Sequence, residues 1–136
     1  LPGAFTPTCS NTQVPGYLEK QDELKAAGID EVLVYCVNDG AVMKAWAADQ
    51  KINHASLLTF MGDPTSALTK ALGMELNHPG PQGKGLWNRC KRHALYVVDG
   101  KVKAVRISEA DDDPAGDDRP EATCAPAMLE IVSASE

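Results

Sequence analysis

The sequence predicts a mixed α/β domain, and two observations carry that prediction. Apolar runs of strand length alternate with helical segments in the first half of the chain, a pattern typical of parallel strands joined by helices. Further along, Asp99-Gly100 separates two more apolar stretches, and Asp-Gly is a typical turn of an antiparallel hairpin. With 136 residues, 43% of them hydrophobic, the chain suits a single domain over residues 1–136.

The first predicted element is a helix from Cys9 to Ala27, with a partly apolar face. Pro15 lacks a backbone donor, so we expect the helix to kink or restart near Pro15-Gly16. Gly28 follows the last helical residue and is a plausible helix stop, because glycine readily adopts the left-handed conformation that ends helices.

Two strands and a second helix follow. The run from Glu31 to Val37 is apolar throughout, which is typical of a buried parallel strand. A helix is predicted from Ala41 to Gln50, with Asn38 or Asp39 as its N-cap. Residues 56–61 form a second apolar run of strand length.

The second half combines short elements with two polar loops. The predicted elements are a helix at 65–72 stopped by Gly73, a loop at 77–85, hairpin strands at 93–98 and 101–107, an acidic loop at 109–121 and a final helix at 125–134. Proline suits the first turn of that last helix, where Pro126 stands.

Charge and composition exclude several classes of protein. The net charge is −6, which argues against nucleic acid or an anionic membrane as the main partner. No apolar run approaches the roughly 18 residues needed to span a bilayer. His54 and His78 lie in or near loops and suggest no metal site.

The cysteines are the chemically informative residues. There are four of them: Cys9, Cys36, Cys90 and Cys124. Their wide spacing is not that of a small disulfide scaffold. The sequence contains no C-x-x-C pair, so it does not suggest a zinc site. Cys9 follows a loop rich in Pro, Gly and Thr, where a helix begins. The free N–H groups and partial positive charge of a helix start stabilise a thiolate, the nucleophilic form of cysteine. Without further information, a lone cysteine is more often a buried small hydrophobe.

The residues around Cys9 resemble a known motif. Pro2, Thr6 and Cys9 form the pattern Pro-x-x-x-Thr-x-x-Cys, which resembles the peroxidatic motif of the peroxiredoxins. The string PGAFTPTCS resembles the peroxiredoxin-5 (type II, atypical two-cysteine) subfamily. Three later segments resemble the same subfamily in the same order: VND with VMKAW at 37–46, ALGMEL at 71–76 and KRHAL at 91–95.

The resemblance implies a thioredoxin-like fold, with a mixed central sheet flanked by helices, and a thiol peroxidase. Hydrogen peroxide and organic hydroperoxides would be reduced to water and alcohols through a sulfenic acid on Cys9. Thr6 and Arg92 would activate the thiol and bind peroxide, together with the backbone N–H groups of Thr8 and Cys9. Pro2 would shield the thiolate from water. The resemblance implies no metal, haem or flavin cofactor.

Each assigned residue also has a plainer interpretation. Thr6 before Pro7 suits a helix N-cap, and Pro2 suits an ordinary loop. Arg92 belongs to the basic run 89–92, and arginines are mostly exposed. Arg89 is the alternative active-site arginine. His93 should point to the opposite strand face from Arg92, as a packing or surface residue.

The sequence leaves three alternatives for the thiol that would react with the sulfenic acid. Cys124 resembles the subfamily's C-terminal resolving cysteine, and Cys36 is the second choice, with a buried strand residue as its plainer interpretation. The third alternative is a one-cysteine cycle, in which glutathione or glutaredoxin supplies the resolving thiol. The acidic loop before Cys124 suits either a segment that unfolds locally or an inert surface insertion.

The resemblance also implies partners. The reductant would be thioredoxin or the glutaredoxin/glutathione system, and the subfamily commonly forms a homodimer, for which Phe5 and Val37–Val42 are candidate contacts. We expect an intracellular location, in the cytoplasm, a mitochondrion or a plastid. Two other functions fit the same cysteine: a peroxide-sensing redox relay or holdase, and a disulfide oxidoreductase, which the absence of C-x-x-C opposes.

One expectation concerns the start of the chain. In proteins of this fold, the residues just before such a PGAFTPTC loop form a central strand, of which Leu1 would be the last residue. We therefore expect the domain to be N-terminally incomplete and the natural protein to be longer.

Overall fold

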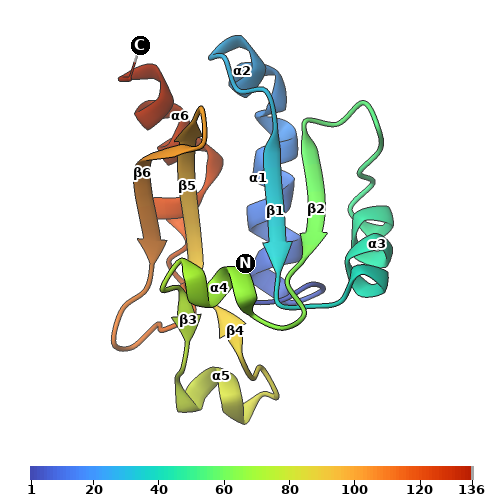
Figure 1. Ribbon diagram of the computed structural model, residues 1–136, viewed down its shortest axis with the longest axis vertical. Helices are drawn as coiled ribbons and strands as arrows, with labels where there is room; N and C mark the ends of the chain where they lie inside the picture. The colour runs from blue at the N-terminus through green and yellow to red at the C-terminus, as the bar shows by residue number, and fades with distance from the viewer. Residues whose placement is uncertain (136) are drawn as a thin grey trace.

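The computed structural model describes residues 1–135 and shows two strand pairs with helices around them (Figure 1). The parallel pair consists of β1 (Val32–Cys36) and β2 (Leu58–Gly62), and the antiparallel pair of β5 (Arg92–Val98) and β6 (Lys101–Ser108). A small third pair joins β3 (Glu75–Leu76) to β4 (Arg89–Cys90). The alternating first half and the hairpin are therefore both confirmed.

The N-terminal helix is divided into three pieces. A π-helical turn, η1 (Cys9–Gln13), leads into α1 (Val14–Glu19), which is followed by α2 (Gln21–Ala26). The change from π to α geometry, one residue before Pro15, is the restart that this proline predicted. The second break, at Lys20, was not predicted. Gly28 ends α2 with a φ of 88°, as expected.

The parallel pair follows the predicted pattern with one exception. Val32 lies opposite Leu58 and Cys36 opposite Gly62, and the connecting helix α3 (Gly40–Asp49) is capped by the Asp39 carboxylate, which accepts from the Val42 N–H at 2.9 Å. The prediction of a fully buried strand was wrong, because Leu33 is 58% exposed. Only one side of β1 pairs with a neighbouring strand of the described chain.

Beyond β2 the elements are short. They comprise α4 (Ala67–Ala71), the pair β3 and β4, and α5 (Pro79–Gly83), which lies between those two strands. The predicted loop at 77–85 therefore contains a helical turn. His78 explains it: its side chain accepts from the Gly80 N–H at 3.0 Å, and Pro79 occupies the first turn.

The hairpin and the last helix match their predictions closely. Asp99 and Gly100 both have positive φ, 50° and 74°, as the predicted turn requires. A short 3-10 turn, η2 (Glu121–Thr123), follows the acidic loop and leads into α6 (Ala125–Ser133) with Pro126 in its first turn.

The main core lies between the N-terminal helix, β1, β2 and α3. Trp46 is its largest fully buried residue and packs on Phe60, with ring centroids 4.8 Å apart. The Trp46 indole N–H also donates to the Ser10 hydroxyl at 3.0 Å. The core thereby fixes the helix turn that begins at Cys9.

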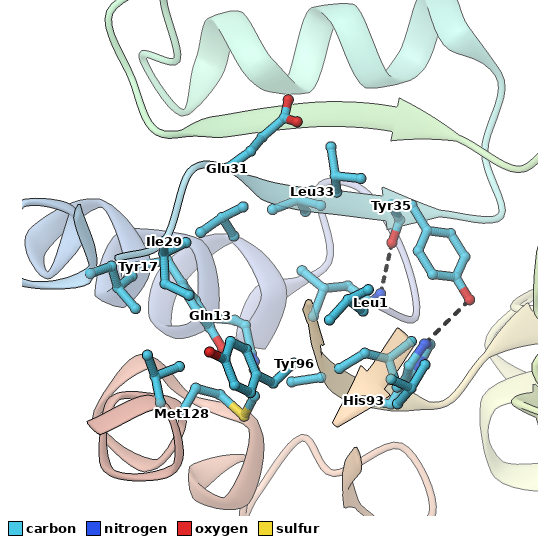
Figure 2. Close-up of a pocket in the computed structure, with 18 of the residues that line it drawn as sticks. Leu1, Gln13, Tyr17, Ile29, Glu31, Leu33, Tyr35, His93, Tyr96 and Met128 are labelled. Atoms are coloured by element: carbon cyan, nitrogen blue, oxygen red, sulfur yellow. Dashed lines mark hydrogen bonds between the residues drawn. The ribbon is translucent and has the colours of Figure 1, made fainter. Parts of the chain in front are cut away.

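An apolar cleft of about 480 Å³ separates β1 from β5 (Figure 2). The Leu1 amino group lies at its wall and donates to the Tyr35 carbonyl at 2.8 Å. The strands of residues 1–135 consequently form three two-stranded sheets, where the sequence predicted one mixed central sheet. Residues of β1 and β5 both line the cleft, and within residues 1–135 the two strands are not paired with each other.

Candidate active site

Two polar side chains, those of Arg89 and Asn38, hydrogen-bond to the backbone of the loop before Cys9. Arg89 donates through Nη1 to the Pro2 carbonyl at 3.2 Å and to Asn38 Oδ1 at 3.3 Å, and Asn38 Oδ1 also accepts from the Ala4 N–H at 3.1 Å. A Cβ on Gly3 would lie 2.8 Å from Arg89 Nη1, so only glycine fits there without a shift. Arg89 therefore supports the loop and, within the described residues, forms no hydrogen bond with Cys9.

Thr6 and Pro2 shape the same loop. The Thr6 hydroxyl donates to the Gly3 carbonyl at 2.6 Å, and the Thr6 carbonyl accepts from the Ser10 N–H at 3.0 Å. The helix begins just after Thr6, but the Thr6 side chain closes the loop and does not cap a helix N–H. Pro2 is fully buried.

Cys9 and Arg92 lie together in the interior. Neither residue has exposed surface, and Arg92 Nη1 donates to Cys9 Sγ at 3.5 Å. Arg92 begins β5, 83 residues along the chain from Cys9. The structure thus places Arg92, and not Arg89, beside the thiol.

Gln13 is a site residue that the sequence reasoning missed. Its Oε1 accepts from Arg92 Nη1 at 3.3 Å, and its Nε2 donates to the Thr123 carbonyl at 2.9 Å. Helix spacing could have found it, because a residue four positions after Cys9 shares roughly the same helix face.

Asp117 is the second missed residue. Its carboxylate forms an ion pair with Arg92 Nη2 at 2.7 Å, while Arg92 Nε donates to the Ala115 carbonyl at 3.1 Å. The Asp117 carbonyl also accepts from the Thr8 hydroxyl at 3.0 Å. The acidic loop predicted at 109–121 therefore contacts both the arginine and the residue next to Cys9.

The candidate resolving cysteines lie in different environments. Cys124 is partly exposed, and its thiol donates to the Pro120 carbonyl at 3.3 Å and to Gln13 Oε1 at 3.9 Å. Burial raises the pKa of the Cys124 thiol, and the nearby Arg92 opposes that effect. Burial raises the pKa of Cys36 to about 12. Cys90 is buried and donates to the Leu1 carbonyl at 3.1 Å.

His93 lies apart from Cys9, on the cleft side of β5 (Figure 2). Its ring packs edge-on against Tyr35, with centroids 5.6 Å apart, and its Nδ1 lies 2.8 Å from the Lys91 carbonyl. Burial lowers the pKa of His93 to about 4. The packing role predicted for it is confirmed.

Clusters of metal ligands and membrane-spanning helices are both missing from residues 1–135. Over residues 1–135, no group of three or more His, Cys, Asp or Glu side chains is arranged to hold a metal ion. Within the same range, no helix combines the length and apolar character needed to cross a bilayer.

Comparison with known proteins places the chain in a family. A family model described as Redoxin matches residues 1–123. Peroxiredoxin-2C of Oryza sativa subsp. japonica is 45% identical over 109 residues, covering 80% of this chain and 64% of that protein. The mitochondrial peroxiredoxin-2F of Arabidopsis thaliana is 39% identical over 113 residues, covering 83% and 54%. The chain thus spans less than two thirds of the length of these relatives.

A solved structure agrees over almost the whole chain. Reduced Prx3 from Vibrio vulnificus is 33% identical and superposes with a TM-score of 0.81, covering 97% of this chain and 76% of that one. The same protein in complex with hydrogen peroxide gives 34% identity and a TM-score of 0.81, covering 97% and 73%. The chain therefore belongs to the redoxin family, among its peroxiredoxins of the type II and peroxiredoxin-5 kind, and the predicted thioredoxin-like fold is confirmed.

Proposed function

We propose that this protein is a thiol peroxidase that reduces hydrogen peroxide and organic hydroperoxides through a sulfenic acid on Cys9. The contact between Cys9 Sγ and Arg92 Nη1, 3.5 Å long and without solvent exposure, carries the proposal. A permanently charged guanidinium beside a thiol favours the thiolate. Membership of the peroxiredoxins supports the same reaction.

The reaction transfers two electrons from sulfur to the peroxide. The Cys9 thiolate attacks the terminal oxygen of the hydroperoxide, the S–O bond forms and the O–O bond breaks. The other oxygen leaves as alkoxide or hydroxide and takes up a proton, giving an alcohol or water, while Cys9 becomes a sulfenic acid. No metal, haem or flavin is needed for this balance.

The surrounding groups have separate roles in that step. Arg92 stabilises the thiolate and the negative charge that develops on the leaving oxygen. Thr8 and Cys9 belong to the first helical turn after Pro7, whose backbone N–H groups can donate to the peroxide. Thr6, whose hydroxyl closes the loop on the Gly3 carbonyl, would help to bind the peroxide, and the buried Pro2 would shield the thiolate from water. Since Cys9 has no exposed surface, local opening of this loop admits the substrate.

The decisive measurement is peroxide consumption with a continuous supply of a thiol reductant. We expect Cys9→Ser to lose turnover and Cys90→Ser, a change at another buried cysteine, to retain it. Turnover that survives in Cys9→Ser would overturn the proposal. If the wild type is oxidised at Cys9 but turns over too slowly to consume peroxide, the alternative of a peroxide-sensing relay or holdase gains support.

For the resolving step we propose Cys124. Its thiol contacts Gln13, which in turn accepts from the arginine that contacts Cys9, so both thiols belong to one hydrogen-bonded group. The Cys124 thiolate would attack the Cys9 sulfenic sulfur and release water, giving a disulfide. Cys36 is the weaker choice, because its thiol is buried and its pKa is raised to about 12.

Mass spectrometry of the peroxide-treated protein tests this step. A Cys9–Cys124 disulfide should form in the wild type and in Cys36→Ser, and should be missing in Cys124→Ser. Only a sulfenic acid or a glutathione adduct on Cys9 would instead establish a one-cysteine cycle. Thioredoxin and the glutaredoxin/glutathione system are then compared as reductants of the oxidised protein.

We also propose a homodimer that uses the loop before Cys9. Phe5 supports it, because this large apolar side chain is 51% exposed on that loop. Val37, the other end of the predicted contact, is buried, so the exposed part of that segment, around Asp39–Ala41, is the better candidate. Sedimentation at several concentrations measures the oligomeric state. For the compartment we propose a reducing one, cytoplasm or organelle, which suits four free cysteines.

A further inference from the structure

The Arg92 guanidinium contacts the sulfur of Cys9 and the carboxylate of Asp117 through different nitrogens. On one side Nη1 donates to Cys9 Sγ at 3.5 Å, and on the other Nη2 pairs with the Asp117 carboxylate at 2.7 Å. The guanidinium has no exposed surface, whereas the Asp117 side chain is 45% exposed. A buried arginine is stabilised where anions and hydrogen-bond acceptors surround it, and the Asp117 carboxylate is the counter-charge that Arg92 contacts.

The loop that carries Asp117 is folded around another carboxylate. Asp113 is buried, and its side chain accepts from the backbone N–H groups of Asp117 at 2.9 Å and of Arg119 at 3.0 Å. Gly116, just before Asp117, has a φ of 65° and packs so closely on Ser108 that a Cβ would collide with the Ser108 carbonyl. These contacts fix the backbone of Asp117 where its side chain meets Arg92.

The same loop also contacts the helix start. The Thr8 hydroxyl donates to the Asp117 carbonyl at 3.0 Å, so Asp117 is tied through its side chain to Arg92 and through its backbone to the residue beside Cys9. An inert surface insertion would need neither contact.

We propose that Asp117 is a positioning residue for the peroxidase reaction: its carboxylate fixes the Arg92 guanidinium against Cys9 and takes part of its positive charge from the thiolate. The proposal rests on the proposed function of Cys9. Asp117 would act on the position of the guanidinium and, separately, on the positive charge that the thiolate experiences. Removing the carboxylate loosens Arg92, whereas neutralising it at constant shape leaves the thiolate as the one anion that Arg92 contacts among residues 1–135.

Two variants and two matched controls separate these effects. Asp117→Ala removes the carboxylate, and Asp117→Asn keeps an acceptor oxygen of the same shape without the charge. Asp118→Asn and Asp118→Ala are the controls, because Asp118 lies in the same loop and its exposed side chain makes no ion pair or hydrogen bond within residues 1–135.

The effect on position is tested by the second-order rate of Cys9 oxidation by hydrogen peroxide. We expect Asp117→Ala to lower this rate roughly tenfold or more, since small displacements of a catalytic group have effects of this size. Asp117→Asn should be impaired less, and Asp118→Ala should react like the wild type. Equal rates for Asp117→Ala and Asp118→Ala would overturn the proposal.

The effect on charge is tested without peroxide. The ultraviolet absorbance of the thiolate, measured against pH as the difference between each protein and its Cys9→Ser counterpart, gives the pKa of Cys9. We expect Asp117→Asn to lower that pKa by about half a unit or more, and Asp118→Asn to leave it unchanged. Equal values in the two Asn variants would overturn the proposal.

A double-mutant cycle shows whether Asp117 acts through the arginine. In the Arg92→Ala background, the effect of Asp117→Asn on the pKa of Cys9 should vanish; an undiminished effect would mean that Asp117 acts on the thiolate directly, against the proposal. Because this measurement needs no turnover, a wild type that failed to consume peroxide would refute the peroxidase function and still leave the link between Asp117, Arg92 and Cys9 measurable.

Discussion

Arg92 is a charged residue without exposed surface, and its geometry explains how it is accommodated. A guanidinium has five donors in a rigid plane, and three of its nitrogens find acceptors on Ala115, Asp117 and the pair Cys9 and Gln13. A lysine ammonium could not reach these directions at once. We therefore expect the role of Arg92 to depend on the planar shape of the guanidinium as well as on its positive charge.

The first prediction follows from that shape. Arg92→Lys keeps the positive charge but loses the fork, so we expect kcat/KM for peroxide to fall by about two orders of magnitude, as when a group stabilising developing charge is removed. Lys91→Arg is the matched control and should retain activity, because within residues 1–135 the Lys91 ammonium pairs only with the exposed Glu109 carboxylate. Activity of the Arg92→Lys protein within about twofold of the wild type would show that charge alone suffices.

At the scale of elements, the acidic loop behaves as an ordered support. It was predicted as either a segment that unfolds locally or an inert insertion. In the structure its backbone is bonded to the buried Asp113 carboxylate, and Gly116 packs on the end of β6. The acidic composition suggested a solvated loop. In the structure one buried carboxylate, which accepts from several backbone N–H groups, orders it.

A glycine substitution tests this support. Gly116→Ala places a Cβ against the Ser108 carbonyl at a φ of 65°, so we expect the free energy of unfolding to fall by about 1–3 kcal/mol. Gly16→Ala, in α1 with open space around its Cβ, should instead stabilise by about 0.5–1 kcal/mol. Denaturant unfolding of both variants measures the difference, and equal midpoints would contradict a close contact at Gly116.

The elements that the sequence predicted are those with local signals. Gly28, Asp39 and Asp99-Gly100 end, cap and turn the chain as expected. The two-residue strands β3 and β4 and the helix α5 have no such signal: Pro79–Gly83 has the composition of a loop, and only the His78 cap and tertiary pairing order it.

The same distinction applies to the candidate site. Cys9, Thr6 and Arg92 could be named from motifs. Gln13 could have been predicted from its helix spacing to Cys9, but its hydrogen bond with Arg92 could not. Asp117 has no local signal at all, because its partner lies 25 residues away and depends on the fold of a loop around Asp113.

For the molecule as a whole, the pH dependence of stability can be predicted from His93. Burial lowers its pKa from 6.5 to about 4, so between these values the unfolded chain binds a proton that the folded chain does not. Stability is therefore full above about pH 6.5 and falls as the pH drops toward 4. The loss is at most about 3 kcal/mol, since one pKa unit corresponds to about 1.4 kcal/mol.

Unfolding by denaturant across this pH range measures the effect, with His93→Phe as the comparison. Phenylalanine fills the site beside Tyr35 without titrating, so the difference in stability between the two proteins should change with pH only in that window. A constant difference would mean that His93 already titrates normally in the folded protein.

The π-helical turn at Cys9–Gln13 sets the direction in which the Cys9 side chain faces. A π turn contains one residue more than an α-helical turn. If these same five residues wound as an α-helix instead, at about 100° per residue, Cys9 would rotate by roughly 90° relative to α1. Sulfur would then point away from the guanidinium, although every named side chain of the site would still be present. The π geometry of this turn is thus as much a determinant of the site as the identity of its residues.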